Sequence, residues 1–231
     1  MIWLFLAIWL AYTAHALYRN LSPTGKSAIA GHLLQFVLLI LAIWWAARSG
    51  LFARTLWSPV DIVFGLGLGH LLFAFSLMIT HQHVGDVIRH SMDFHGITAF
   101  LKISPELVFR FTGVCIIEEL VYRGAAQDML GLKIDHPVPA IIITAVFFCV
   151  LHQHFFRNGW ACAVEFFLFS IAIGVVYYYT YSLTIVALAH LTRNLESAYL
   201  EYNVLLEEHS DSDEALRILG RRHASPVTEN P

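Results

Sequence analysis

The chain has 231 residues, of which 58% are hydrophobic and 13% are charged, and its mean hydropathy is +0.64. Soluble domains carry about 25% charged residues, so this composition leaves about half of the usual ionic surface and excludes a soluble globular protein. The formal net charge of −3 at pH 7 provides no basic field for nucleic acid and excludes that class of partner. A membrane-spanning helix needs about 20 apolar residues, and the length suits one polytopic domain.

The three cysteines lie in separate apolar stretches and lack the spacing of metal ligands. They are Cys115, Cys149 and Cys162. We therefore expect buried packing thiols, with neither a disulfide nor a cysteine metal site.

The sequence predicts an all-α fold, a polytopic transmembrane helix bundle of about seven spans. The first segment, residues 1–18, has neither a basic n-region nor a small-residue cleavage site, so we expect a retained span instead of a signal peptide. Turn-forming pairs such as Ser104-Pro105 and His136-Pro137 separate later apolar runs. The predicted spans cover about residues 2–18, 29–47, 60–80, 105–130, 138–156, 160–181 and 183–200.

Two stretches are too polar to span a membrane. Residues 81–102 predict a loop or a surface-lying segment, and their irregular histidine spacing favours an exposed cluster over a metal site. The chain after Leu206 is acidic and then basic, which predicts a short exposed helix and a disordered end. The histidines of the first stretch are His81, His83, His90 and His95.

These patterns divide the chain into three regions. Residues 1–104 are expected to hold N-terminal membrane spans and the polar loop. Residues 105–200 are expected to form a helix bundle with ionisable residues inside its spans, and residues 201–231 an exposed charged tail.

Lys and Arg are unevenly divided between alternate loops, with eight on one side and three on the other. Because cytoplasmic loops are enriched in Lys and Arg, we expect an integral multi-pass membrane protein with the N-terminus outside and the C-terminus inside. The cytoplasmic set is Arg19, Lys26, Arg89, Lys102, Arg157, Arg217, Arg221 and Arg222. The opposite set is Arg48, Arg54 and Lys133.

Ionisable side chains occur inside three of the predicted spans. Each costs about 2.5–3.5 kcal/mol on insertion scales, so these residues are expected to face the bundle interior, where they have a function. Residues four apart share one helical face, which predicts an ion pair between Glu119 and Arg123. The same spacing predicts that the members of the other two groups point together. Those groups are Phe148 with His152, and His190 with Asn194.

The two adjacent glutamates differ in direction by about 100° around a helix. Glu118 therefore faces away from Arg123 and lacks this partner. A carboxylate in a low-dielectric site without a full partner is suited to act as a general base.

The order E-E-x-x-x-R, F-x-x-x-H and H-x-x-x-N on successive apolar helices resembles the CPBP/Abi intramembrane proteases, which include the type II CAAX prenyl endopeptidases. The resemblance covers about residues 105–200. It implies an intramembrane endopeptidase that hydrolyses a peptide bond of a membrane-associated protein or peptide by glutamate-activated water.

The resemblance implies a role for each motif residue. Glu118 would take a proton from the attacking water, and His152 would hold that water. Glu119 would bind Arg123 and fix their helix. The donors to the developing oxyanion would be His190 and Asn194.

Three neighbouring polar residues receive separate expectations. His154 lies on a different helical face from His152 and is expected to be structural or interfacial. Glu165 and Arg193 are candidates for charges that line the bundle.

Several other interpretations compete with a metal-free protease. His152, His190 and Glu118 could ligate a catalytic zinc with a water, but the chain has no H-E-x-x-H helix and Asn194 is a poor zinc ligand, so we expect no cofactor. A non-catalytic immunity or scaffold protein could keep the same fold and bind a peptide. A proton-coupled carrier would use intramembrane Glu and His as a relay, but the expected inverted repeat is missing.

For individual residues the alternatives are structural. The glutamates and Arg123 could form an ion pair that joins helices. His152 could be satisfied by a backbone carbonyl. His190 and Asn194 could be polar links between helices.

Overall fold

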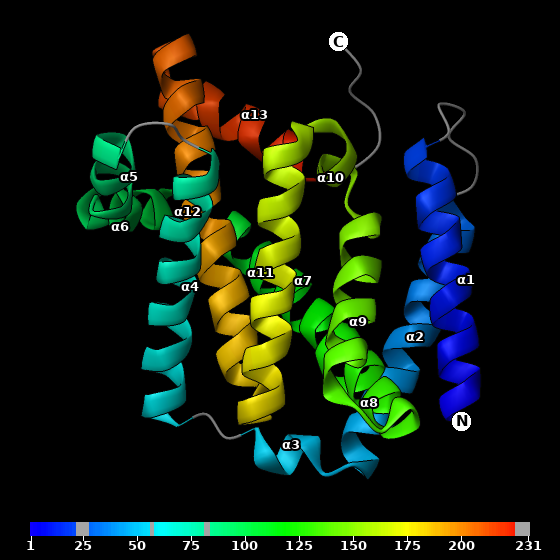
Figure 1. Cartoon of the computed structure of the whole chain (residues 1–231). Coiled ribbons are helices and arrows are strands. Elements are labelled where there is room, and N and C mark those ends of the chain that lie inside the picture. Colours follow the sequence, from blue (N-terminus) through cyan, green and yellow to red (C-terminus); the bar gives the residue numbers. More distant parts are fainter. Residues whose placement is uncertain (22–27, 56–57, 81–83, 225–231) are drawn as a thin grey trace.

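The computed structural model describes residues 1–21, 28–55, 58–80 and 84–224, and the regular structure within these ranges is entirely helical (Figure 1). The long helices are α1 (Ile2–Leu21), α2 (Ala28–Arg48), α4 (Pro59–Thr80), α7 (Pro105–Glu119), α9 (Pro137–Leu151), α11 (Gly159–Thr180) and α12 (Leu183–His209). The shorter ones are α3 (Leu51–Arg54), α5 (Val84–Ser91), α6 (Phe94–Ile103), a π-helical segment η1 (Leu120–Gln127), α8 (Asp128–Ile134), α10 (Gln153–Arg157) and α13 (Ser212–Ala224). The all-α prediction is confirmed.

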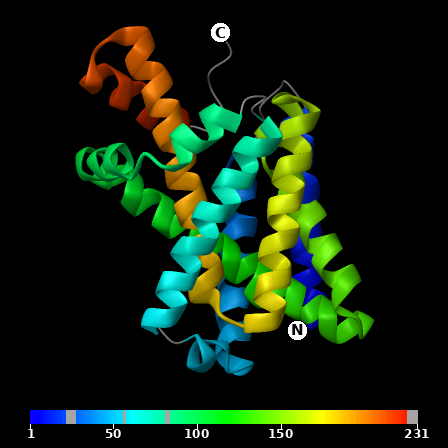
Figure 2. The same cartoon turned by 60° about the vertical axis from the view of Figure 1, so that its left-hand side comes forward.

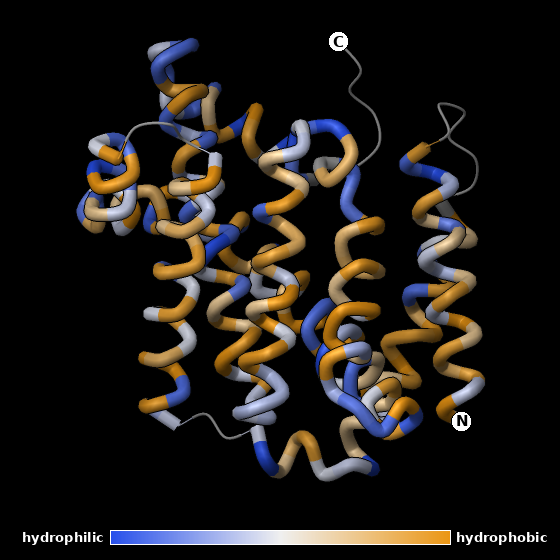
Figure 3. The backbone as a smooth tube through the Cα atoms, in the orientation of Figure 1, coloured by the Kyte–Doolittle hydropathy of each residue, from blue (hydrophilic) through white to orange (hydrophobic). Residues whose placement is uncertain are grey.

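Three described helices are long and apolar enough to cross a membrane, namely Ile29–Arg48 in α2, together with α4 and α11. Two shorter apolar helices, α6 and α9, accompany them. Figure 3 shows hydrophobic residues along the bundle helices and hydrophilic ones gathered at several helix ends and in α13. The chain is therefore an integral multi-pass membrane protein, and the count of seven spans stays a prediction.

Two helical segments end at residues other than those that the sequence predicts. The segment predicted at 105–130 continues through α7, η1 and α8 to Ile134, and the segment predicted at 138–156 breaks after Leu151. The two ends of the bundle differ in what they carry (Figure 1): Met1 and α8 lie at one, which we call the Met1 end, and α5, α10 and α13 lie at the other, the α13 end.

Glycines allow α4 to approach α12 closely. A Cβ atom on Gly69 would lie 2.5 Å from the Ala189 carbonyl oxygen, and one on Gly65 would lie 2.9 Å from the Ile185 carbonyl oxygen. Such small residues let membrane helices pack backbone to backbone. The contact fixes the part of α12 that directly precedes His190.

The polar stretch between α4 and α7 forms two surface helices, α5 and α6, which confirms a surface-lying segment. Asp93 begins α6 by accepting a hydrogen bond from the Gly96 amide at 3.0 Å. Figure 2 shows α6 standing away from the bundle on the side of α12. His90 and His95 lie in these helices, whereas His81 and His83 lie outside the described residues.

The C-terminal region contains the predicted short helix, α13, but one face of this helix is buried and not exposed. α12 runs past residue 200 to His209, and α13 then folds back on it. Ala215 and Leu219, four residues apart on α13, are buried against Tyr202 and Leu205 of α12. One apolar face of an otherwise charged helix is sufficient for this docking, so the region is an amphipathic helix packed on the bundle.

Close α4–α12 packing predicts that Gly69→Ala destabilises the fold. The added methyl group must displace the α12 backbone, and overpacking of this kind costs about 1–3 kcal/mol. The control is Gly67→Ala on the same helix, where a Cβ atom would meet nothing within 4 Å. Melting temperatures in detergent should fall for Gly69→Ala only, and equal values for the two variants would contradict the prediction.

The docking of α13 is expected to depend on pH through Glu201. Its carboxylate lies 3.0 Å from His223 Nε2 and 2.8 Å from Arg222 Nη1. Burial alone would raise the pKa of Glu201, but the hydrogen bonds from His223 and Arg222 outweigh it and hold the pKa below its usual range. A lowered folded-state pKa gives stability that is present above the unfolded value and is lost as pH falls through the folded one.

We therefore expect hydrogen-exchange protection of residues 212–224 to be constant at neutral pH and to fall below about pH 4.3, the ordinary Glu value. Glu201→Gln should show weaker protection that no longer changes over this range. Full protection of α13 in the unmodified chain well below that pH would contradict the role of Glu201.

Candidate active site

Glu119 joins two elements at the centre of the bundle. Its carboxylate is 0% exposed, with Oε2 3.4 Å from Arg123 Nε and Oε1 2.8 Å from His190 Nδ1. The predicted i,i+4 ion pair with Arg123 is confirmed. The contact with His190 ties α7 to α12.

The π-helical segment η1 directs Arg123 toward α11. Arg123 Nη2 donates to the Ser170 carbonyl at 3.2 Å and to the Ser170 hydroxyl at 3.0 Å. Four residues later, Gln127 Nε2 donates to the Gly174 carbonyl at 2.8 Å. π-Helical turns are rare in proteins, and those that occur are frequently at functional sites. This one is hydrogen-bonded to α11 at two successive turns.

Glu118 has a different environment from its neighbour. Its side chain is 24% exposed, with Oε1 3.7 Å from His152 Nε2 and Oε2 3.9 Å from His190 Nε2. These separations exceed the usual hydrogen-bond range of about 2.7–3.2 Å and suit a bridging water. Two imidazoles therefore face one accessible carboxylate.

His152 lies at the end of α9, which corrects the expectation that it lies well inside a span. Its backbone is extended (φ −95°, ψ 120°), and its Nδ1 lies 2.9 Å from the Phe148 carbonyl oxygen. The helix ends here because Asn20 Nδ2 of α1 donates to the carbonyls of Val150 and Leu151 at 3.1 and 3.0 Å. Terminal carbonyls have no partner within their helix, and Asn20 supplies one.

Asn20 is a site residue that sequence reasoning missed. Its only sequence signal is a lone amide near the end of an apolar segment, and nothing local to it indicates α9 as its partner.

Phe148 is the apolar centre of the cluster and is completely buried. Its ring centroid lies 4.7 Å from that of His152 and 5.8 Å from that of His190, and Arg123 Cζ lies 5.2 Å from it. The predicted contact between Phe148 and His152 is therefore present. The ring fixes both imidazoles from one side.

Asn194 lies one turn after His190 on α12. Its Oδ1 accepts from Arg193 Nη1 at 3.3 Å, and its Nδ2 contacts Cys115 Sγ at 3.6 Å. Arg193 Nη2 in turn binds both oxygens of Glu165, at 2.8 and 2.9 Å, and Ser76 donates to the same carboxylate. The expected bundle-lining charges, Glu165 and Arg193, thus form a network that orients the Asn194 amide.

Other expectations at the site have mixed outcomes. All three cysteines are free thiols; Cys115 and Cys149 are buried, and Cys162 is partly exposed. The side chain of His154 lies outside the described residues. Among the residues that the structure describes, no group of three or more His, Cys, Asp and Glu side chains is arranged to hold a metal ion.

Comparison with known proteins identifies the central segment. Residues 100–195 match the family model of the type II CAAX prenyl endopeptidases, described as Rce1-like. The match begins in α6, ends in α12 and contains all the candidate catalytic residues, so the resemblance seen in the sequence motifs is confirmed over this segment. No curated protein and no solved structure matches the chain.

The buried position of Arg123 predicts a structural effect. Arg123→Ala leaves Glu119 with an uncompensated charge, and a broken buried pair costs about 3–5 kcal/mol. Yield and melting temperature in detergent should both fall. The control is Arg89→Ala on α5, since the exposed Arg89 pairs with the exposed Asp86 at 2.6 Å and exposed pairs contribute about 0–1 kcal/mol. Equal losses in the two variants would contradict the central role of Arg123.

Proposed function

We propose that this chain, whose residues 100–195 belong to the type II CAAX prenyl endopeptidase family, is an intramembrane endopeptidase that uses a glutamate-activated water. One observation carries the proposal. The Glu118 carboxylate is partly exposed and lies between His152 and His190, at 3.7 and 3.9 Å, whereas the adjacent Glu119 is engaged by Arg123 and His190.

Glu118 is the general base in this mechanism. A water between its carboxylate and His152 Nε2 gives a proton to Glu118, and its oxygen attacks the carbonyl carbon of the scissile peptide bond. Glu118 later returns the proton to the leaving amine. Glu119 is unsuited to this role because its oxygens already face a guanidinium and an imidazole and have no access to water.

His190 and Asn194 stabilise the oxyanion of the tetrahedral intermediate. Glu119 accepts from His190 Nδ1 and holds the ring in place, and in the imidazolium form Nε2–H is a second donor that can bind the developing charge. One such donor contributes about 2.7–4 kcal/mol in soluble proteases. The Asn194 amide is the second donor. Arg193 holds its Oδ1, and Nδ2, which contacts Cys115 Sγ with one hydrogen, has a second hydrogen for the oxyanion.

The reaction is proposed to need no metal ion. The zinc alternative would use Glu118, His152 and His190 as ligands, and activity that is lost in chelator and restored by zinc would support it. The non-catalytic alternative would bind a peptide without cleaving it, and binding would then survive Glu118→Gln.

The substrate is proposed to be a protein or peptide held in or at the bilayer. The family name points to prenylated CAAX proteins as one such class. The orientation of the chain follows the predicted excess of basic residues at the α13 end. We propose that the chain lies in a bacterial cell membrane with this end on the cytoplasmic side. The Met1 end then lies outside.

The adjacent glutamates allow a sharp test. The chain and its variants are reconstituted in lipid with a farnesylated CAAX peptide or the same peptide without the prenyl group, and fragments are detected by mass spectrometry. Glu118→Gln keeps the shape of the side chain and should abolish cleavage with normal yield and melting temperature. Glu119→Gln should retain some cleavage and lose stability, because Arg123 loses its counter-charge.

Glu106→Gln is the matched control, because this glutamate lies on the same helix and is 93% exposed. It should change neither cleavage nor stability. Full cleavage by Glu118→Gln would exclude the proposed mechanism, and an exchange of the two phenotypes would reverse the roles of Glu118 and Glu119.

A further inference from the structure

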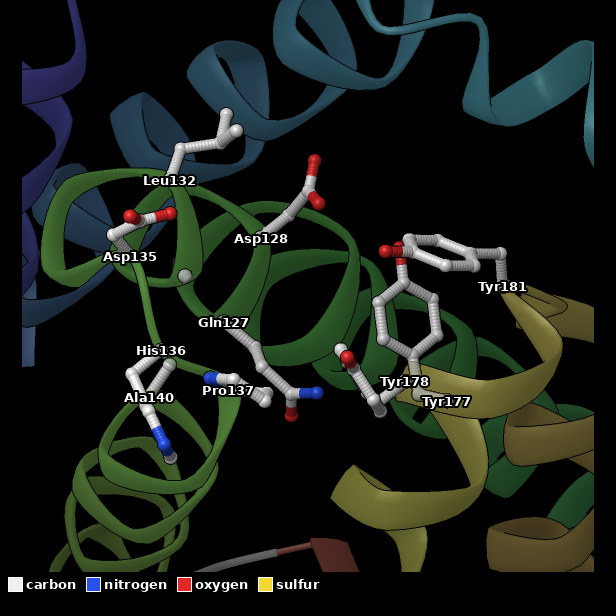
Figure 4. A pocket seen from close by; sticks show the side chains of 11 residues that line it. Gln127, Asp128, Leu132, Asp135, His136, Pro137, Ala140, Tyr177, Tyr178 and Tyr181 are labelled. Carbon is white, nitrogen blue, oxygen red and sulfur yellow. The ribbon is translucent and has the colours of Figure 1, made fainter.

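A second pocket lies near the Met1 end of the bundle and shares no lining residue with the candidate active site. It occupies about 320 Å³ between η1 and α8, the turn before α9, and the last turn of α11. Figure 4 shows the side chains that line it. Those that carry its chemistry are Gln127, Asp128, Asp135, Tyr177, Tyr178 and Tyr181.

Two of these polar side chains are almost completely buried. Tyr177 is 2% exposed and lines the pocket. Gln127 is 5% exposed, and while its Nε2 binds the Gly174 carbonyl, its Oε1 has no partner. A buried polar atom without a partner, such as Gln127 Oε1, is costly, and the side chains of Gln127 and Tyr177 both line the pocket.

The charge of the pocket is negative. Asp128 and Asp135 contribute carboxylates, the described lining residues include neither Lys nor Arg, and His136 is the basic side chain among them. Asp128 accepts one hydrogen bond, from Trp45 Nε1 at 2.9 Å, which leaves its second oxygen available. A cationic ligand therefore fits the pocket better than an anionic one.

Three tyrosine rings add attraction for a cation. The Tyr181 ring centroid lies 5.9 Å from that of Tyr177 and 6.5 Å from that of Tyr178. Arg54 Cζ already lies 5.9 Å from the Tyr181 ring centroid, just outside the pocket lining, as expected for a cation attracted to an aromatic face. Tyrosines at the end of a span commonly anchor it at the membrane surface, but the buried Tyr177 faces the pocket.

We propose that this pocket binds a small organic ammonium group, such as the ethanolamine headgroup of a phospholipid or a free primary amine. Its volume lies at the lower end of the range for small-molecule sites, about 300–1,000 Å³, which suits a headgroup without its acyl chains. The carboxylates of Asp128 and Asp135 supply the negative charge that attracts the ammonium group, and the Tyr177 oxygen can accept one of its hydrogens. A metal ion fits less well, because the described residues offer no cluster of three or more His, Cys, Asp and Glu side chains.

The test measures binding to the full chain in detergent by titration calorimetry. Three probes are used: dihexanoyl phosphatidylethanolamine, free ethanolamine, and dihexanoyl phosphatidylglycerol, which has the same chains without an amine. We expect the amines to bind and the glycerol lipid not to bind. Binding of the ethanolamine lipid alone identifies a lipid headgroup as the source, and binding of ethanolamine alone identifies a free amine.

Two variants connect binding to the pocket. Asp135→Asn removes one charge and keeps the backbone, because Asp135 has φ +55° and asparagine tolerates this left-handed conformation. Tyr177→Phe removes only the hydroxyl. Since Asp135→Asn loses a charge that attracts the ammonium group and Tyr177→Phe loses a hydrogen bond to it, the dissociation constant should rise about tenfold or more. Tyr179→Phe is the control, since Tyr179 is on the same helix, 78% exposed and outside the pocket lining.

Failure of both amines to bind, or equal binding of the glycerol lipid, would overturn the proposal. Unchanged affinity in Asp135→Asn and Tyr177→Phe would also overturn it. If Tyr177→Phe does not fold, the partly solvated Asp135→Asn still decides the matter. Peptide cleavage plays no part in this measurement, so its outcome is independent of the proposed protease activity.

Discussion

The buried carboxylate of Glu119 is the constraint on which the candidate site depends. A charge that is 0% exposed in a membrane bundle needs full compensation, and Arg123 and His190 provide it from η1 and α12. Arg123 is itself tied to α11 through Ser170. One buried charge therefore links three structural elements, and His190 is oriented as a consequence of this electrostatic requirement.

The same requirement separates the two glutamates. Their backbone positions are adjacent, yet Glu119 is buried against the Arg123 guanidinium and the His190 imidazole, while Glu118 is partly open and faces imidazole nitrogens at 3.7 and 3.9 Å. The residue type alone therefore does not distinguish the roles of Glu118 and Glu119. The direction of each side chain around the helix decides whether it stabilises the fold or remains available for chemistry.

The features predicted from the sequence were those that depend on local spacing. Glu119 and Arg123 pair because they lie four residues apart on one helix, and the all-α fold follows from the apolar runs. Ala215 and Leu219 have the same spacing, so the buried face of α13 had a sequence signal that the surrounding charges concealed. Features that depend on distant partners were not predictable. The end of α9 at His152 depends on Asn20, which is 130 residues from Val150 in the sequence, and the π-helical segment has no sequence signature of its own.

The Asn20 contact also bears on modularity. The segment that matches the endopeptidase family starts at residue 100, but the cap that ends α9 comes from α1, and the glycines that seat α12 come from α4. The boundary of family similarity is thus not the boundary of the working unit. If the motif-bearing helices were excised or grafted into another membrane protein, His152 would lose its helix cap and α12 would lose the surface against which it is seated. The N-terminal helices act as a scaffold for geometry that the family motifs alone do not specify.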